Sequence, residues 1–474
     1  MHPRNSIIAV VTAALIGSAS TALAATPAKQ PNANPPVKVT AKQRGKSGQN
    51  KVTKTMNTAK KTTSIDSESK KKSTSKTPKQ EKNKAPLVES YLIEGKLEDG
   101  KLAVIEALSQ NPKDDSLRFS LGVTQFIQTI ERFSQDISYY GLRGTSEEGI
   151  QAPFLRIRLK PNQTSHPISY QDFRQIFKRV QTGFAKADET LAQITDEKVQ
   201  LRLRWGLIRL DLNSDGDPSD EEMLWRIYQR ITRNDEFGQE DAENFSIKFD
   251  RGDVHWLRGY CNLIGSLCQM FLAYDSQQWF ESSGHIVFAK VVGPYGFLTH
   301  GQSVRKLGGE QIDVTDLIAS IHNIHWEVKE PERLKAALLN LENVVEQSKI
   351  SWNFIMAETD DDCEWLPNPR QTGVIPNVRV TEDMVKTWGD MMNQSGKVLR
   401  GELLVPFWRG ERGEYGVNLR RVFLEPRTFD LVTWVQGTAA QPYLEKGHLA
   451  KGDAWKNVRE VFGNRYIGFA AWFN

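Results

Sequence analysis

The chain has 474 residues, a formal net charge of +4 and three cysteines. Three cysteines are too few for a disulfide framework, and their number is odd. After residue 24 no stretch approaches about 18 consecutive apolar residues, which excludes a transmembrane helix in the rest of the chain.

Residues 1–24 have the pattern of a signal peptide. Arg4 gives a positive start, residues 7–17 form an apolar run, and Ala22-Leu23-Ala24 is a small-x-small cleavage site. The apolar run is too short to span a bilayer. We therefore expect cleavage after Ala24 and a secreted or periplasmic protein. The alternative is an uncleaved membrane anchor at residues 7–17.

Residues 25–84 form a Lys-rich segment. It contains 15 Lys, one Arg and only three acidic residues, a net charge of +13, and it has no aromatic residue. Such a composition cannot bury enough apolar area to offset the entropy of ordering, so we expect a disordered linker. It serves either as a solvated spacer or as an electrostatic contact with an anionic surface.

The net charge divides the chain into a basic tail and an acidic body. Residues 1–84 carry +14, so the whole-chain charge of +4 leaves −10 for residues 85–474. An acidic body argues against nucleic-acid binding by the folded part, and it is compatible with cation binding.

Residues 85–143 are predicted to be helical and to open a helical body at 85–365. The sequence YLIEGKLEDGKLAVIEALSQNP begins at Tyr91 and has small residues at Gly95 and Ala103, and it resembles a tetratricopeptide-type repeat. The resemblance implies a repeat surface for a protein or peptide partner. Because only about one and a half repeats are visible, a plain αα-hairpin is the alternative.

An acidic loop at residues 211–222 fits the calcium-loop pattern D-x-[DN]-x-[DN]-G-x5-E without a gap. Calcium takes about six to eight oxygen ligands, and Gly216 stands where such a loop turns sharply. The candidate metal ligands are Asp211, Asn213, Asp215, Asp217 through its backbone carbonyl, Ser219 and Glu222.

Apolar residues recur at helical spacing on both sides of this loop. They are Leu201, Trp205 and Ile208 before it, and Leu224 and Ile227 after it. The pattern resembles an EF-hand and predicts a helix, a loop and a helix over about 197–232. The resemblance implies a calcium ion that clamps the two helices.

Two features differ from an ordinary EF-hand. The chain has no second loop of this type, and position 8 is Pro218, which has no N–H to offer a partner loop. The loop is therefore more similar to the solitary loops of dockerin-like calcium repeats in secreted bacterial proteins. The alternative is a turn rich in Asp, Asn and Gly, with Ser219 or Asp220 capping the next helix.

Apolar spacing and end signals predict further helices at residues 170–194, 249–275, 313–328, 331–357 and 381–395. Residues 279–312 contain several glycines and are expected to form a loop with a short strand or turn. Residues 366–474 mix short apolar runs with Gly and Pro, which predicts an irregular α+β segment packed on the body.

Several other polar residues are candidates for chemistry. Asp253 and His255 lie at the start of a predicted buried helix, where capping is the favoured role. His322 and His325 are spaced to share a metal ion on one helical face, but the sequence supplies no third ligand. The acidic run at 358–364 is expected to be solvated, with a second cation site as the alternative.

Cys261 and Cys268 lie seven residues apart on one face of that buried helix, too far along its axis to bridge each other. Buried free thiols are the default for both. A bridge from Cys363 to either of them stays open in an exported protein.

These signals predict a mainly α protein with a repeat-like hairpin, an EF-hand-like loop and a less regular α+β C-terminal part. The motifs G-x-S-x-G, H-E-x-x-H, G-x-G-x-x-G and the P-loop do not occur. We therefore expect a secreted calcium-binding scaffold or binding protein, in which calcium is mainly structural. The alternative is a secreted hydrolase that acts on cell-wall or polysaccharide material through carboxylates such as Asp253 or Asp361.

Overall fold

The computed structural model describes most of the chain from residue 85 onward. The described ranges are 85–143, 164–232, 237–300, 313–362, 364–374, 379–409, 415–450 and 453–462. The signal peptide, the Lys-rich segment and Cys363 lie outside the described residues, so what the sequence indicates for them stays a prediction.

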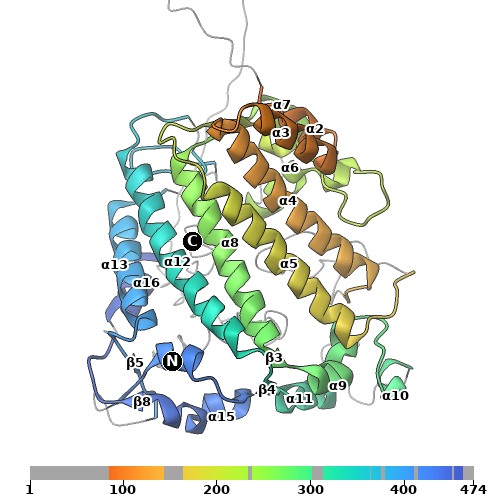
Figure 1. The fold of residues 1–474 in the computed structure, drawn as a ribbon, viewed down its shortest axis with the longest axis vertical. Helices are drawn as coiled ribbons and strands as arrows, with labels where there is room; N and C mark the ends of the chain where they lie inside the picture. The colour runs from red at the N-terminus through yellow and green to blue at the C-terminus, as the bar shows by residue number, and fades with distance from the viewer. Residues whose placement is uncertain are drawn as a thin grey trace, which may run out of the picture. The chain divides into compact units, whose positions relative to one another are not determined.

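Five long helices lie side by side and form the frame of the structure (Figure 1). Each is antiparallel to the next, as the contacts of Gly252 with Ser351 and of Asp188 with Arg258 illustrate. In order across the frame they are α4 (Asp115–Tyr139), α5 (Tyr170–Leu191), α8 (Arg251–Ala273), α12 (Pro331–Ala357) and α13 (Glu382–Leu399).

Helix α8 is apolar nearly all round because it is enclosed between α5 and α12. Leu257 and Leu272 are buried in two different core clusters along its length. Cys261 and Cys268 are buried as well, and both thiols are free. Helix α3 (Leu97–Gln110) packs against α4, so the helical layers continue from the start of the described chain.

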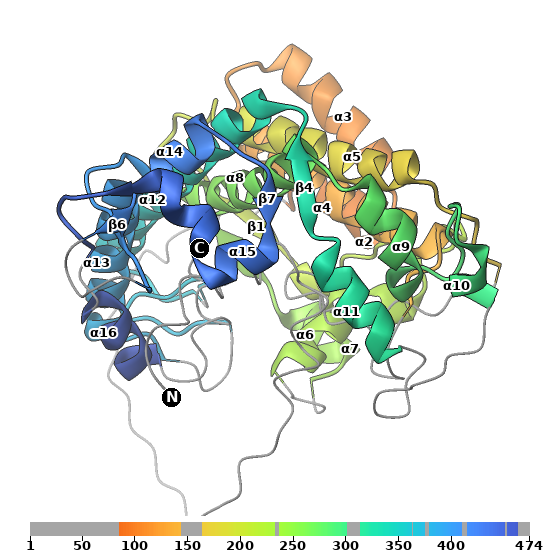
Figure 2. The same ribbon diagram turned by 90° about the horizontal axis from the view of Figure 1, so that it is seen from below.

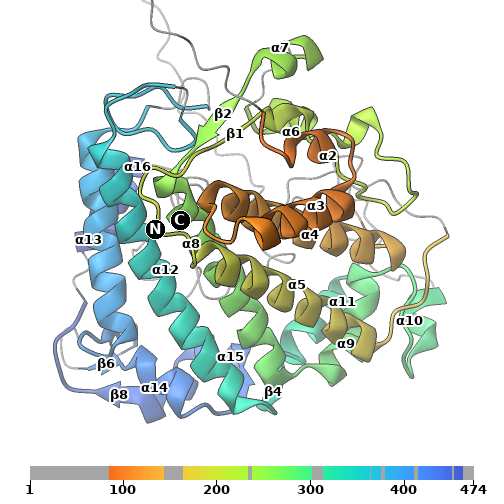
Figure 3. The same ribbon diagram turned by 45° about the horizontal axis from the view of Figure 1, so that its top comes forward.

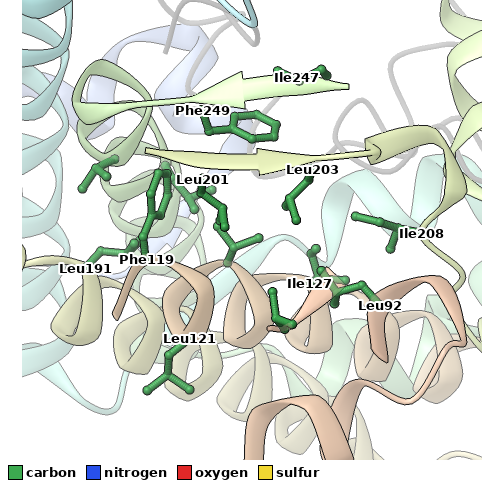
Figure 4. Close-up of a cluster of buried hydrophobic side chains, with 14 of the residues drawn as sticks. Leu92, Phe119, Leu121, Ile127, Leu191, Leu201, Leu203, Ile208, Ile247 and Phe249 are labelled. Carbon is green, nitrogen blue, oxygen red and sulfur yellow. The ribbon is translucent and has the colours of Figure 1, made fainter. Parts of the chain in front are cut away.

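A group of small elements packs at the end of the frame where α3 lies (Figures 1 and 3). These elements are α2 (Glu89–Ile93), β1 (Leu201–Leu203), η2 (Trp205–Leu207), η3 (Asp220–Glu222), α6 (Leu224–Thr232), α7 (Gln239–Asn244) and β2 (Ile247–Phe249). Strands β1 and β2 pair antiparallel, with Leu201 opposite Phe249. Figure 4 shows their apolar side chains meeting Phe119 and Ile127 of α4. This cluster holds the chain in place just before the acidic loop begins.

Short helices and strands cover the opposite end of the frame. They are β3 (Tyr274–Asp275), α9 (Gln277–Val287), α10 (Gly296–His300), α11 (Val314–His322), β4 (His325–Val328), β5 (Val405–Pro406), β6 (Gly416–Val417), α14 (Leu419–Leu424), β7 (Phe429–Asp430), α15 (Leu431–Gln436), η4 (Thr438–Tyr443) and β8 (Leu444–Glu445). Two antiparallel sheets, β3-β4-β7 and β5-β6-β8, join them. Helix α16 (Asp453–Phe462) packs along the side of α13. Figure 2 shows α9–α11 on one side and α13, α14 and α16 on the other, with β4 and β7 between them.

The mainly α fold is confirmed, and so are four of the predicted long helices, now bounded at residues 170–191, 251–273, 331–357 and 382–399. The C-terminal part is the predicted mixture of short strands and helical turns. No helix within the described residues is long and apolar enough to cross a bilayer. The tetratricopeptide-like resemblance stays a prediction, although α3 and α4 do pack as neighbours.

The helix predicted before the acidic loop is wrong. Leu201 and Leu203 are buried in β1 with a half-exposed residue between them, and the chain then makes a single 3-10 turn at Trp205–Leu207. Apolar spacing was ambiguous here, because residues that alternate with period two can also include pairs four apart. Only a helix after the loop, α6, agrees with the EF-hand-like expectation.

Two further predictions are wrong. Helices α9 and α10 occupy part of 279–312, where the glycines suggested a loop. The helix predicted at 313–328 ends at His322, and the chain continues as β4, where Trp326 is buried and pairs with Phe429 of β7. In both cases packing against distant segments decides the local structure.

Helices α4 and α5 approach closely where Gly183 faces Thr129. A methyl group added at Gly183 would lie 2.7 Å from Thr129 Cγ2. We expect Gly183→Ala to destabilise the protein by about 1–3 kcal/mol, although alanine has the higher helix propensity. Gly389→Ala on α13 is the matched control, since nothing lies within 4 Å of its added methyl group, and it should stabilise by about 0.5–1 kcal/mol. Differential scanning calorimetry that gave both variants the same Tm shift would contradict the close α4–α5 contact.

Candidate metal centre

The two ends of the acidic loop at 211–222 are held together by backbone pairing. The Leu224 N–H donates to the Ile208 carbonyl at 3.0 Å, and the Leu210 N–H donates to the Glu222 carbonyl at 3.4 Å. Arg209 and Met223 form an antiparallel bridge between these two bonds. A short hairpin-like stem therefore joins the two ends of the loop. It stands where an EF-hand has two helices.

Side chains at the candidate ligand positions shape the inside of the loop. The Asp215 N–H donates to Asn213 Oδ1 at 2.8 Å, and the Asp217 N–H donates to Asp215 Oδ1 at 2.9 Å. The Gly216 N–H donates to Asp211 Oδ2 at 3.2 Å. Gly216 has a φ of 80°, and Ser214 has a φ of 63°. Glycine is needed at 216 for this left-handed turn alone, because a methyl group there would meet nothing within 4 Å.

Glu222 ties the last part of the loop to the first. Its Oε2 accepts hydrogen bonds from the N–H and the hydroxyl of Ser219, both at 2.9 Å, in a capping box at η3. Its Oε1 accepts from the Leu212 N–H at 2.9 Å. Glu222 is only 8% exposed. Ser219 stands at the N-cap position of η3, but its hydroxyl donates to Glu222 and the turn has no side-chain cap hydrogen bond, so the predicted cap of a following helix is not confirmed. Glu222 lies inside the loop, as a closing ligand must.

Asp211 is held from outside the loop by helix α4. Its N–H donates to Glu131 Oε1 at 2.9 Å, and its carbonyl accepts from Gln135 Nε2 at 2.8 Å. Its Oδ1 is buried and has no hydrogen-bond partner. A buried carboxylate oxygen without a partner is costly, and a cation is one way to satisfy it.

Glu131 is a site residue that the sequence reasoning missed. Burial raises the pKa of its carboxyl to about 7. The hydrogen bond from Asp211 opposes the shift, and the charges of Asp211 and Glu222 increase it. Glu131 therefore lies close enough to Asp211 and Glu222 for their charges to act on it. No sequence signal connects a glutamate on α4 to a loop 80 residues later.

Pro218 packs on the turn between α2 and α3. That turn passes through Gly95, whose φ is 70°, and a methyl group on Gly95 would lie 2.6 Å from the Pro218 ring. Arg209 donates to the Pro218 carbonyl at 3.4 Å and pairs with Asp220 at 3.0 Å. The position that would face a partner loop in a paired EF-hand thus contacts the repeat-like start of this same chain.

The residues present fit calcium in their chemistry. All the candidate side-chain ligands carry oxygen, the ligand type that calcium prefers, and Asp211 Oδ1 has no other partner. Asp215 and Asp217 are exposed, whereas Asp211 and Glu222 lie inward. Within the described part of the chain, no three His, Cys, Asp or Glu side chains converge as a ready metal site. Ligands other than these types, such as Asn213, Ser219 and the Asp217 carbonyl, would have to contribute.

A second acidic cluster, separate from the loop, lies where α8 begins and α12 ends. Asp250 caps α8 by accepting the Gly252 N–H at 2.8 Å, and Asp253 accepts the Asp250 N–H at 3.0 Å in a capping box. The predicted capping role of Asp253 is therefore confirmed. Glu358, just after α12, and the buried Glu364 complete the cluster. The acidic run at 358–364 was expected to be solvated. That prediction is wrong for Glu364, which is buried, whereas Asp360, Asp361 and Asp362 are exposed.

Burial and mutual repulsion make this cluster hold protons. Burial raises the pKa of Asp253 well above its usual range, and the charge of Asp250 adds to the effect. Burial and Asp250 raise the pKa of Glu358 to about 8. Lys248 does not neutralise the cluster fully, since its ammonium group bonds instead to Asp360 and, at 3.0 Å, to Asp362.

The remaining candidates have structural contacts. Asp361 accepts from the N–H and the hydroxyl of Thr372 at 2.7 and 3.1 Å, so it braces a loop. His255 Nδ1 pairs with Gln347 Oε1 at 2.7 Å in the α8–α12 interface. His325 lies on β4 and bonds to Asp430 at 2.8 Å, whereas His322 ends α11, so the two histidines do not share a helical face.

Compared with known proteins, the chain matches no family model, no curated protein and no solved structure. The EF-hand-like resemblance therefore stays a prediction, and the function has to be argued from the contacts above.

The acidic cluster should make stability depend on pH. Since the pKa of Glu358 is about 8 in the folded state, folding retains a proton that the unfolded chain releases near pH 4.5. The contribution of Glu358 to the free energy of unfolding is therefore greatest below about pH 4.5, and it falls as the pH rises toward 8. We expect Glu358→Gln to be about 1–3 kcal/mol more stable than the parent at pH 8.5 and nearly equal to it at pH 4.5. Chemical denaturation at the two pH values measures this difference.

Glu346→Gln is the matched control, because Glu346 is exposed on α12, the helix that ends just before Glu358. It should leave the pH dependence unchanged. If both variants differ from the parent in free energy of unfolding by the same amount at pH 4.5 and pH 8.5, the cluster does not retain the proton.

Proposed function

We propose that this protein is a secreted calcium-binding scaffold or binding protein, and that the calcium ion stabilises its fold. The observation that carries the proposal is Asp211 Oδ1, a buried carboxylate oxygen without a partner inside a loop of calcium-type sequence. Glu222 and Glu131 add negative charge beside it. Such a concentration of acidic groups is destabilising until a cation neutralises it.

The ligand set in the proposal is the one that the sequence indicates: Asp211, Asn213, Asp215, the Asp217 carbonyl, Ser219 and Glu222. A bound calcium ion would supply positive charge and a centre for several oxygen ligands. Glu222 links Leu212 to Ser219, and Asp211 is attached to α4. Neutralising these residues would therefore tighten the loop against α4 and the start of α6. A solitary loop in an extracellular setting suits a weak Kd of about 10⁻⁴–10⁻³ M.

The scaffold part of the proposal is supported by the surface of α3. Leu102 and Ile105, one turn apart on α3, are 55% and 44% exposed. Apolar side chains exposed together on the repeat-like start suit a protein or peptide partner. The Lys-rich segment at 25–84 would add contact with an anionic surface.

A hydrolase remains the alternative proposal. Its best support is the proton-holding cluster around Asp253 and Glu358, because a catalytic acid needs a raised pKa. Asp253 and Asp361, the carboxylates first suggested for such chemistry, are engaged in a helix cap and a loop brace. These contacts account for the positions of both carboxylates without a catalytic role, so we prefer the calcium-binding proposal.

Calorimetric titration of the purified chain with calcium chloride tests the proposal. We expect binding heat and, at about 10 mM calcium, a stabilisation of about 1–3 kcal/mol for a Kd of 10⁻⁴–10⁻³ M. Asp211→Ala and Glu222→Ala should abolish both the heat and the stabilisation, since each removes a ligand that lies inward.

Asp217→Ala is the control within the loop. Asp217 would serve through its backbone carbonyl and its side chain is exposed, so this variant should keep most of the affinity. If the parent protein shows neither binding heat nor a Tm change with calcium, the proposal is wrong and the loop is an ordinary turn.

A further inference from the structure

We propose that Glu131 of α4 is a positioning residue of the calcium loop, and that its charge makes calcium binding stronger and couples the ion to the helical frame. This inference rests on the proposed function. It assigns a role to a residue outside the loop that the calcium-loop pattern does not contain.

The first support is geometric. Glu131 and Gln135 lie one helical turn apart on α4, and together they bind both backbone groups of Asp211. Glu131 Oε1 accepts the Asp211 N–H at 2.9 Å, and Gln135 Nε2 donates to the Asp211 carbonyl at 2.8 Å. With its backbone fixed on both sides, Asp211 can present its side chain in only a narrow range of directions. Its Oδ2 accepts the Gly216 N–H, which leaves the buried Oδ1 for an ion.

The second support is charge. Glu131 is partly buried, and its carboxyl group lies directly against Asp211, the first candidate ligand of the acidic loop. The adjacent cation, Arg132, is exposed and lies 3.4 Å from Glu98, so its charge is shared and screened by water. A calcium ion held by Asp211 and Glu222 would be a positive charge able to compensate Glu131. The attraction is mutual, so the charge of Glu131 should strengthen the binding of the ion.

The third support is the path from α4 into the frame. One turn beyond Glu131, Asp136 pairs with Arg179 of α5 at 2.9 Å. On the preceding turn, Thr129 packs against Gly183 of α5. The part of α4 that holds Asp211 is therefore also a part that contacts α5. Through α4, a loop at the end of the frame can stabilise the row of long helices.

Two substitutions separate the charge from the hydrogen bond. Glu131→Gln keeps an oxygen that can accept the Asp211 N–H, but removes the charge. Glu131→Ala removes both. Glu106→Gln, at an exposed position on α3, is the control for loss of a negative charge elsewhere. Calcium Kd by calorimetry, and Tm with and without calcium, are measured for the full chain and each variant.

We expect Glu131→Gln to bind calcium about ten-fold more weakly than the parent, the order expected for one partly screened charge a few ångströms from a divalent ion. Without calcium its Tm should equal or exceed that of the parent, because repulsion is relieved, and calcium should raise it less. Glu131→Ala should lower the Tm without calcium, because the Asp211 N–H loses its acceptor. Glu106→Gln should behave as the parent in both measurements.

The outcomes distinguish this inference from the proposed function. If the parent binds calcium and Glu131→Gln has the same Kd and the same calcium-dependent Tm rise, Glu131 is only a structural brace and the inference is overturned while the calcium site stands. If the parent does not bind calcium at all, the proposed function fails, and this inference fails with it.

Discussion

The structure depends on the burial of helix α8 between α5 and α12. A helix that is apolar nearly all round is stable only with neighbours on both sides, and the antiparallel row supplies them. Polar pairs along the α8–α12 contact fix the register: Gly252 with Ser351 at one end, and Gln269 with Arg333 at the other. The small strands and the acidic loop among the described residues pack on or beside this row.

The antiparallel arrangement has an electrostatic consequence. The start of α8 and the end of α12 lie together, so one partly positive and one partly negative helix end share the same place. Asp250 and Asp253 suit the start of α8, which explains the capping box. Glu358 follows the end of α12, where a negative charge is unfavourable, and it also faces Asp250. The cluster therefore retains protons through its position between two helix ends, and a catalytic task is not needed to explain it.

Local signals predicted the long helices and their caps well. Asp253, for example, accepts the Asp250 N–H at 3.0 Å in the capping box of α8. They failed where distant contacts decide. Leu201 and Leu203 have neighbours in β2, so the segment before the acidic loop is a strand. In the same way, the loop pattern identified the candidate ligands within twelve residues, but Glu131 reaches the loop only through the fold. Spacing along a chain cannot reveal such a contact.

The stem of the acidic loop bears on what calcium could do there. In an EF-hand, an ion links two helices and can change the angle between them. Here the chain enters through a strand and a 3-10 turn, and only α6 follows the loop. The ends are already joined by the Leu224–Ile208 and Leu210–Glu222 bonds, and Pro218 is packed on Gly95. A loop closed in this way has no pair of helices to reorient. A bound ion would change how strongly the loop is held against α4, which is why the role that we propose for calcium is structural.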